Sequence, residues 1–143
     1  MGLTDGNATF QINQNMTTKK QPTANILLVD DEPNILIALE FLMQQQGYTV
    51  ETAKDGQAAL EIMEYYTPDV VLLDVMMPGM DGFEVAKKIR EDAALHNTQI
   101  IFLTAKGTKE DRRKGYKSGG EIYLTKPFDN AELIEAVAYA LKI

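Results

Sequence analysis

The sequence predicts an α/β fold in which five parallel strands form a doubly wound sheet, in the order 2-1-3-4-5, with five helices. From residue 25 onward, short apolar runs alternate with helical patterns and short turns, as in repeated βα units. Several runs are continuously apolar, which is typical of strands buried on both faces. Two of them end in aspartate: Ile26–Val29 precedes Asp30 and Asp31, and Val70–Leu73 precedes Asp74. Open α/β sheets bind their ligands at that edge.

The five strands are assigned to short runs of apolar and β-branched residues that are bounded by turn-forming segments. In chain order the predicted strands are Ile26–Val29, Thr49–Thr52, Val70–Leu73, Ile100–Leu103 and Ile122–Leu124.

Five helices are expected to connect and follow these strands. The first begins with Pro33, whose fixed φ suits a helix start, and Gly47 is expected to end it. The last follows Asp129, an N-cap residue with Glu132 three positions later. The predicted helices are Pro33–Gln46, Gly56–Tyr66, Gly82–Glu91, Lys109–Lys117 and a last one that carries Leu133, Ile134, Val137 and Leu141 inward. This succession is the flavodoxin-like arrangement.

The composition is that of an ordinary folded chain, with 45% apolar and 24% charged residues among 143. The net charge of −7 argues against general binding to nucleic acid or to an anionic membrane. No cysteine is present, which excludes disulfides, thiolate metal sites and cysteine nucleophiles. No stretch approaches the ~20 apolar residues of a membrane span, and no signal-peptide pattern opens the chain, so we expect a cytoplasmic protein.

The chain divides into two unequal parts. Residues 1–23 are polar and without periodicity, and we expect a disordered N-terminal tail or a non-native remnant of cloning. Residues 24–143 carry all the βα patterns and are long enough for one domain with its own core.

Two further polar side chains follow inner strands. Thr104 comes after the fourth run and Lys126 after the fifth, so both are expected at the edge that carries the aspartates. Carboxylates favour Mg²⁺, and the fact that no His or Cys belongs to this set argues against zinc. A carboxylate can attack a phosphoryl group, while the metal, Lys126 and Thr104 would each stabilise one equatorial oxygen. Each residue alone has an ordinary structural explanation, but their convergence on one edge favours an aspartate-phosphorylation site.

Residues 25–143 resemble the receiver domain of bacterial response regulators, in its stand-alone, chemotaxis-regulator-like form. The motifs that carry the resemblance, in order, are Asp30-Asp31, the run from Leu72 to Gly82 (Leu-Leu-Asp-Val-Met-Met-Pro-Gly-Met-Asp-Gly), Thr104-Ala105 and Lys126-Pro127-Phe128. The resemblance implies that residues 24–143 form a receiver domain.

The same resemblance implies roles for the acidic residues. Asp74 would be the phosphoacceptor. Asp30 and Asp31 would bind Mg²⁺ together with Asp74 and the backbone carbonyl of Met76. Lys126 would contact the phosphoryl group.

The resemblance also implies a conformational switch. Thr104, the third member of the catalytic set with Asp74 and Lys126, would reorient on phosphorylation, and Tyr123 would swing inward behind it. Ordinary packing remains an alternative for this tyrosine. The family further implies a cis peptide bond between Lys126 and Pro127, where the cis form costs only about 0.5–1 kcal/mol.

The function implied is a phosphoacceptor switch of a two-component or phosphorelay system, rather than a turnover enzyme. A sensor histidine kinase or a histidine phosphotransfer protein would supply the phosphoryl group from phosphohistidine, in a Mg²⁺-dependent step. A downstream protein target would then recognise the changed surface. Because the sequence ends at Ile143, directly after the last helix, we expect no DNA-binding effector and no direct contact with nucleic acid.

Two features of the surface bear on partners. The segment Lys106–Lys117 holds six basic residues and is either a solvated helix face or a docking patch. The last helix has no arginine, and Ile122 stands where receivers of winged-helix regulators commonly have an acidic residue, so their charged dimer is not expected.

Two other classes of protein compete with this interpretation. A phosphatase of the haloacid dehalogenase type also uses an aspartate nucleophile, but it needs a second aspartate two residues later, where this chain has Met76. A flavodoxin-like nucleotide binder needs a Gly-rich or Ser/Thr-rich loop after the first strand, where Asp30, Asp31 and Glu32 would repel phosphate.

Overall fold

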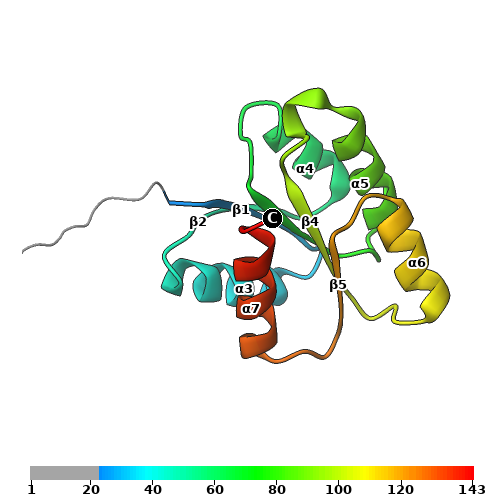
Figure 1. Cartoon of the computed structure of the whole chain (residues 1–143). Coiled ribbons are helices and arrows are strands. Elements are labelled where there is room, and N and C mark those ends of the chain that lie inside the picture. The colour runs from blue at the N-terminus through cyan, green and yellow to red at the C-terminus, as the bar shows by residue number, and fades with distance from the viewer. Residues whose placement is uncertain (1–22) are drawn as a thin grey trace, which may run out of the picture.

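Five parallel strands form one sheet in the order β2-β1-β3-β4-β5, which confirms the predicted topology (Figure 1). A computed structural model describes residues 23–143, so the predicted tail, apart from its last residue, lies outside the described residues. The strands are β1 (Asn25–Val29), β2 (Thr49–Ala53), β3 (Val70–Leu73), β4 (Gln99–Thr104) and β5 (Ile122–Thr125).

Helices cover both faces of the sheet (Figure 1). The first and last, α3 and α7, pack on one face, and α4 and α5 pack on the other. The helix α6 lies beside the edge strand β5. Their bounds are α3 (Pro33–Gln45), α4 (Gly56–Ile62), α5 (Gly82–Glu91), α6 (Lys109–Lys117) and α7 (Asn130–Ala140).

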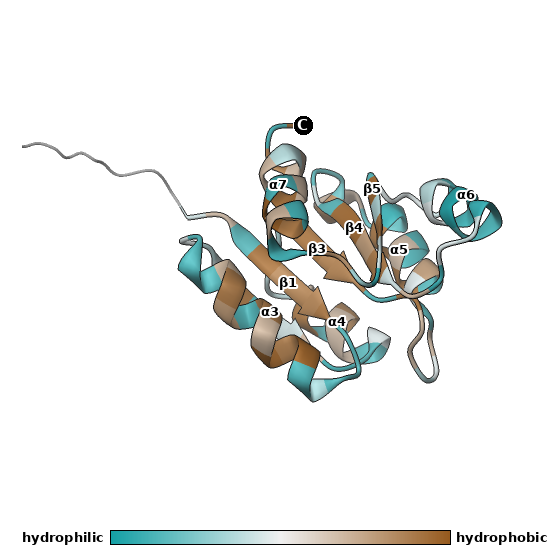
Figure 2. Ribbon diagram, turned by 90° about the horizontal axis from the view of Figure 1, so that it is seen from below, coloured by the Kyte–Doolittle hydropathy of each residue, from teal (hydrophilic) through white to brown (hydrophobic). Residues whose placement is uncertain are grey.

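The core consists of two layers that the strands separate. In β1, Leu27 and Val29 belong to the layer beneath α4 and α5, and Ile26 and Leu28 belong to the layer beneath α3 and α7. All four side chains are at most 1% exposed, and each contributes about 1.5–3 kcal/mol by burial. Figure 2 shows that the central strands are mostly hydrophobic, whereas the helices around them alternate between hydrophobic and hydrophilic residues. Apolar runs without alternation are therefore explained by burial on both faces.

Capping residues explain where the predicted helices begin and end. Pro33 opens α3, and Gly47, with φ of 91°, follows its end. Asp129 and Glu132 form a reciprocal capping box at the start of α7, as the sequence predicts.

The second helix is shorter than predicted. It ends at Ile62, whereas the sequence pattern continues to Tyr66. The amides of Glu64 and Tyr65 bond to carbonyls three residues back, so the chain tightens into turns after Ile62. A short 3₁₀ helix that the sequence did not predict, η2 (Ala93–Leu95), follows α5. Among residues 23–143, none of the helices has the length and apolar character needed to cross a membrane.

Candidate functional site

Three carboxylates meet at the carboxyl ends of β1 and β3. The register pairs Val29 with Leu73, so Asp30 and Asp74 stand one position beyond neighbouring strand ends, and Asp31 follows directly. Each of the three offers a ligand oxygen, and these oxygens all lie within 4.8 Å of one another. Asp30 and Asp74 are only 2% and 6% exposed, and Asp31 is open to solvent. The geometry therefore supplies an oxygen-rich group that could hold a divalent cation.

A lysine partly balances this negative charge. Lys126, which directly follows β5, places its Nζ 3.1 Å from Asp30 Oδ2 and 3.7 Å from Asp74 Oδ2. Because β5 is two strands away from β3, the long side chain extends across the end of β4 to reach the carboxylates. One ammonium group therefore contacts two buried carboxylates, and the cluster retains net negative charge.

Backbone amides orient the two buried carboxylates. The amide of Glu32 donates to Asp30 Oδ1 at 2.9 Å, and the amide of Met76 donates to Asp74 Oδ1 at 3.3 Å. In both aspartates the second oxygen, Oδ2, is the one that faces Lys126. One oxygen of each carboxylate thus accepts a hydrogen bond from a backbone amide, and the other oxygen faces the ammonium group of Lys126.

Burial raises the pKa of Asp74 above its ordinary value, although Lys126 opposes the change. The nearby charge of Asp30 raises this pKa further, while the backbone amides of Met76 and Val75 lower it. Desolvation is the largest of these effects because the side chain sits in the sheet end, away from bulk water. A cation bound beside Asp74 would favour its ionised form.

The loop after β3 folds closely around Asp74. The amide of Gly82 bonds to the carbonyl of Val75 at 3.0 Å, which turns the chain back toward the strand end. A Cβ atom at Gly82 would lie 2.3 Å from the Asp74 carbonyl oxygen. Only glycine permits this approach, which explains why the motif after Asp74 ends in Gly82.

A cavity of about 280 Å³ opens above the carboxylates. Of the predicted site residues, the structure brings Asp31, Asp74, Met76 and Lys126 together in its lining, with Asp30 directly behind them. Two further lining residues, Glu32 and Ala105, were not predicted as site residues. Their position directly after Asp31 and Thr104 was the only signal that could have identified them.

Thr104 ends β4 beside the site but does not line the cavity. It is fully buried, its Oγ1 accepts a hydrogen bond from the Lys106 amide at 3.3 Å, and its carbonyl accepts one from the Lys126 amide at 2.8 Å. The threonine therefore connects the loop after β4 to the lysine of the site.

Tyr123 lies on β5, paired with Phe102 of β4, and its ring is turned inward. The ring is 4% exposed, lies 5.7 Å from the Phe102 ring between centroids, and its hydroxyl donates to the Lys106 carbonyl. Burial and the charge of Asp111 raise the pKa of Tyr123 to about 12, so the hydroxyl stays a donor at neutral pH. The ring is therefore already buried in this structure, and its movement on phosphorylation stays a prediction. The Lys126–Pro127 peptide bond is cis, as the resemblance implied.

The comparison with known protein families shows which family the chain belongs to. The family model of the response regulator receiver domain matches residues 26–138. The chain belongs to this family.

Relatives agree with that assignment. The response regulator Rre1 of Synechocystis is 37% identical over 110 residues, which cover 76% of this chain and 48% of that protein. The chain therefore spans about half the length of this curated relative. Among solved structures, the chemotaxis protein CheY4 of Vibrio cholerae is 35% identical with a TM-score of 0.80, over 84% of this chain and 100% of that one.

A second solved structure bears on the ligands of the family. The response regulator TrrA of Thermotoga maritima, determined in complex with Mg²⁺ and a beryllofluoride, is 37% identical with a TM-score of 0.74. The alignment covers 83% of this chain and 100% of that one.

Proposed function

We propose that this receiver domain, residues 24–143, is a phosphoacceptor switch and that Asp74 is the residue phosphorylated. A carboxylate oxygen of Asp74 attacks the phosphorus of a phosphohistidine, the P–N bond breaks, and the imidazole leaves with the electron pair. The product is an acyl phosphate on Asp74. The observation that carries this proposal is the position of Asp74, a buried carboxylate that lines an open cavity and lies beside two further carboxylates, Asp30 and Asp31.

The donor set fits Mg²⁺. Asp30, Asp31 and Asp74 would hold it with the backbone carbonyl of Met76, since all are oxygen ligands and the described residues place no His nearby. When bound, Mg²⁺ supplies positive charge to the phosphoryl oxygens and to the three carboxylates. The lone ammonium of Lys126 is insufficient for this, because the cluster around it keeps net negative charge.

Three residues of the chain would act on the phosphoryl group or report its presence. Lys126 is close enough to Asp74 to contact a phosphoryl oxygen after a small shift of its ammonium group. Thr104 would exchange its bond with the Lys106 amide for one to the phosphoryl group. The buried ring of Tyr123 would occupy its present position more firmly once the threonine moved toward Asp74.

The partners follow from this chemistry. We propose a sensor histidine kinase or a histidine phosphotransfer protein as donor, and a protein target that recognises the phosphorylated surface. The domain would catalyse its own phosphorylation and slow dephosphorylation. The absence of cysteine suits a location in the reducing cytoplasm. The expectation that the domain acts alone stays a prediction.

The test is to incubate the protein with Mg²⁺ and acetyl phosphate and to measure its intact mass. We expect the wild type to gain one phosphoryl group that is stable in acid and labile in base, and Asp74→Asn to gain none. Asp92→Asn, at an exposed aspartate that starts η2, is the matched control and should be labelled like the wild type.

Two results would contradict the proposal. Labelling of Asp74→Asn to the same extent would place the acceptor elsewhere. An unlabelled wild type, with Mg²⁺ and with a phosphorylated histidine phosphotransfer protein as donor, would exclude the switch altogether.

A further inference from the structure

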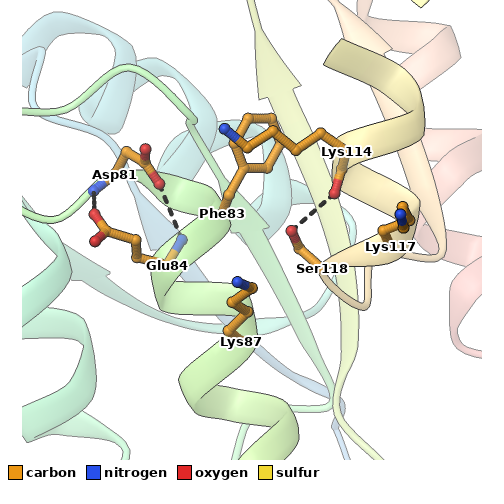
Figure 3. A pocket seen from close by; sticks show the side chains of 7 residues that line it. All are labelled: Asp81, Phe83, Glu84, Lys87, Lys114, Lys117 and Ser118. Carbon is orange, nitrogen blue, oxygen red and sulfur yellow. Dashed lines mark hydrogen bonds between the residues drawn. The ribbon is translucent and has the colours of Figure 1, made fainter. Parts of the chain in front are cut away.

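A second and larger cavity lies between α5 and α6, apart from the residues of the phosphoryl site (Figure 3). It measures about 500 Å³ and its lining comprises Lys87, Lys114 and Lys117, the ring of Phe83, Ser118, and at one end Asp81 and Glu84. We call it the α5–α6 groove. None of its lining residues belongs to the phosphoryl site, so the groove needs an explanation of its own.

Three lysines and two carboxylates line the groove, so its formal net charge is +1 (3 − 2). Lys87, Lys114 and Lys117 are all exposed, and none of them forms an ion pair within residues 23–143. They come from two helices, and their side chains surround one hollow (Figure 3). A concentration of cations on a chain whose net charge is −7 makes this groove a local attractor for anionic groups.

The two acids of the groove form no ion pair with these lysines within residues 23–143. Asp81 accepts a hydrogen bond from the Glu84 amide, and Glu84 accepts one from the Asp81 amide, both at 2.9 Å (Figure 3). This capping box fixes both carboxylates at the start of α5. The two acids therefore lie at one end of the groove, toward which the Lys114 side chain extends over Phe83, and Lys117 lies at the other end (Figure 3).

Phe83 is the one apolar side chain that lines the groove, and it is only 4% exposed. The Lys114 ammonium lies 5.0 Å from the centroid of the Phe83 ring, a cation–π contact that holds the lysine across the hollow. The Ser118 hydroxyl donates to the Lys114 carbonyl at 2.8 Å, so its proton is already engaged. Recognition in the groove thus depends on lysine ammonium groups, with lysine stems and part of an aromatic ring beneath them.

We propose that the α5–α6 groove is the docking site for a short acidic segment of a partner protein. Carboxylates of the segment would pair with Lys87, Lys114 and Lys117, and an apolar side chain would lie on the lysine stems. This inference goes beyond the proposed switch and does not depend on phosphorylation of Asp74. It also gives a specific form to the docking alternative for the basic segment Lys106–Lys117.

A peptide fits the groove better than nucleic acid does. Duplex DNA carries one charge about every 1.7 Å and needs an extended basic track. Here three lysines are followed by Asp81 and Glu84, which would repel a continuing phosphate backbone. A short segment can end before it reaches these acids.

The test uses a synthetic peptide of twelve residues, in which pairs of glutamate alternate with leucine and phenylalanine, and ¹⁵N-labelled protein. We expect saturable changes in amide chemical shift that are confined to α5, to α6 and to Ser118, which directly follows α6. The variant with Lys87→Gln, Lys114→Gln and Lys117→Gln should bind about tenfold or more weakly, since three charge pairs at the groove are lost. A control with Lys88→Gln, Lys109→Gln and Lys142→Gln has the same net charge and should keep the affinity within about twofold.

Thermal melts of both triple variants confirm that each is folded before binding is compared. The proposal would be overturned by any of these results: no saturable shift at these amides up to about 1 mM peptide, equal weakening in both triple variants, or tighter binding of a DNA oligonucleotide of equal charge at the groove. A peptide with glutamine in place of glutamate should not shift the same amides, and equal shifts by that peptide would likewise refute it.

Discussion

Asp74 occupies a position that costs stability when its carboxylate is ionised and no cation is bound. The side chain is 6% exposed, Asp30 stands nearby, and Lys126 neutralises only part of the charge. Burial therefore raises its pKa in the folded state. A residue retained at such a cost is expected to have a functional reason, which the proposed phosphorylation supplies.

This cost predicts how stability depends on pH. Because the pKa of Asp74 is higher in the folded chain than in the unfolded chain, its ionisation disfavours folding at neutral pH. The penalty shrinks as pH falls through the folded pKa, and it vanishes below the unfolded value of 3.8. Without divalent cations, Asp74→Asn should unfold at a higher temperature at pH 7, by about 1 kcal/mol or roughly 4 °C, with little difference near pH 3.5.

Thermal unfolding in the presence of a chelator, followed by circular dichroism at both pH values, measures this difference. Glu64→Gln, on the surface, is the control and should stay within about 0.5 kcal/mol of the wild type. An Asp74→Asn variant that is less stable than the wild type at pH 7 would show that Lys126 compensates fully for the burial.

At the scale of elements, Arg90 connects α5 to the opposite end of the sheet, away from the site. Its guanidinium donates to the carbonyls of Thr98 at 2.8 Å and Gly119 at 2.9 Å, and it pairs with Glu121 at 3.0 Å. Glu121 in turn accepts from the Ile100 amide at 2.6 Å. One side chain thus joins a helix to the starts of β4 and β5.

Replacing this arginine should destabilise the fold. We expect Arg90→Met to cost about 1–3 kcal/mol, because two carbonyls and a carboxylate lose a charged donor at a partly buried place. Arg113→Met removes an exposed pair with Glu110 and should change stability by less than about 0.5 kcal/mol. Urea denaturation of both variants measures the contrast, and equal losses would mean that the Arg90 network contributes no more than a surface ion pair.

A second prediction for the elements concerns Gly115 in α6. A Cβ atom there would lie 2.7 Å from Tyr123 Cδ2 and 3.2 Å from Phe102 Cδ2. Gly115→Ala should therefore cost about 1–3 kcal/mol through overpacking, although alanine normally favours a helix by about 1 kcal/mol over glycine. Denaturant unfolding measures the loss.

The double variant Gly115→Ala with Tyr123→Ala is the control for the steric clash between the added Cβ atom and the Tyr123 ring. Removal of the ring makes room for the added methyl group, so alanine at Gly115 should then cost nothing. If Gly115→Ala alone stabilises the protein, the tyrosine ring does not occupy the inward position.

At the scale of the whole molecule, the acidic cluster links cation binding to global stability. A ligand that binds only the folded state stabilises it by mass action, by about 2.7 kcal/mol at a hundredfold excess over its Kd. Since Asp30, Asp31 and Asp74 converge only in the folded sheet, millimolar Mg²⁺ should raise the unfolding temperature of the wild type. Differential scanning calorimetry with Mg²⁺, and with NaCl at equal ionic strength, separates binding from charge screening.

The variant Asp31→Asn tests the same link, because it removes one exposed ligand without disturbing the core. It should lose most of the stabilisation by Mg²⁺ while keeping its stability in NaCl. An equal rise in both proteins, or no rise in the wild type, would count against a metal site formed by these carboxylates.

Most of the architecture could be predicted because local patterns express it directly. Continuous apolar runs such as Val70–Leu73 mark strands buried on two faces, and capping residues such as Asp129 mark helix starts. The helix α4 was one exception, beside the unpredicted η2: its apolar pattern continues past Ile62, but turn bonds end the helix there. Helix propensity alone does not determine the residue at which a helix gives way to turns.

Part of the site could likewise be predicted from the sequence, and part could not. The identity of its polar residues, and the strand ends that carry them, follow from sequence order and the topology of parallel sheets, which bring Asp30 and Asp74 to one edge. Which oxygen of each carboxylate faces Lys126, the direction of the Thr104 hydroxyl and the inward ring of Tyr123 do not follow from sequence order. They depend on side-chain packing between strands that are distant along the chain.

The α5–α6 groove shows the same limit on a surface. The chain order reveals six basic residues in the segment Lys106–Lys117 but not which of them share a hollow with Lys87. Which lysines line the groove depends on how α5 and α6 pack side by side. No sequence pattern links residues of two helices that are separated along the chain. Local preferences and strand order therefore determine the fold and the residues of the site, whereas the contacts made between distant segments determine their orientation, their charge balance and the groove.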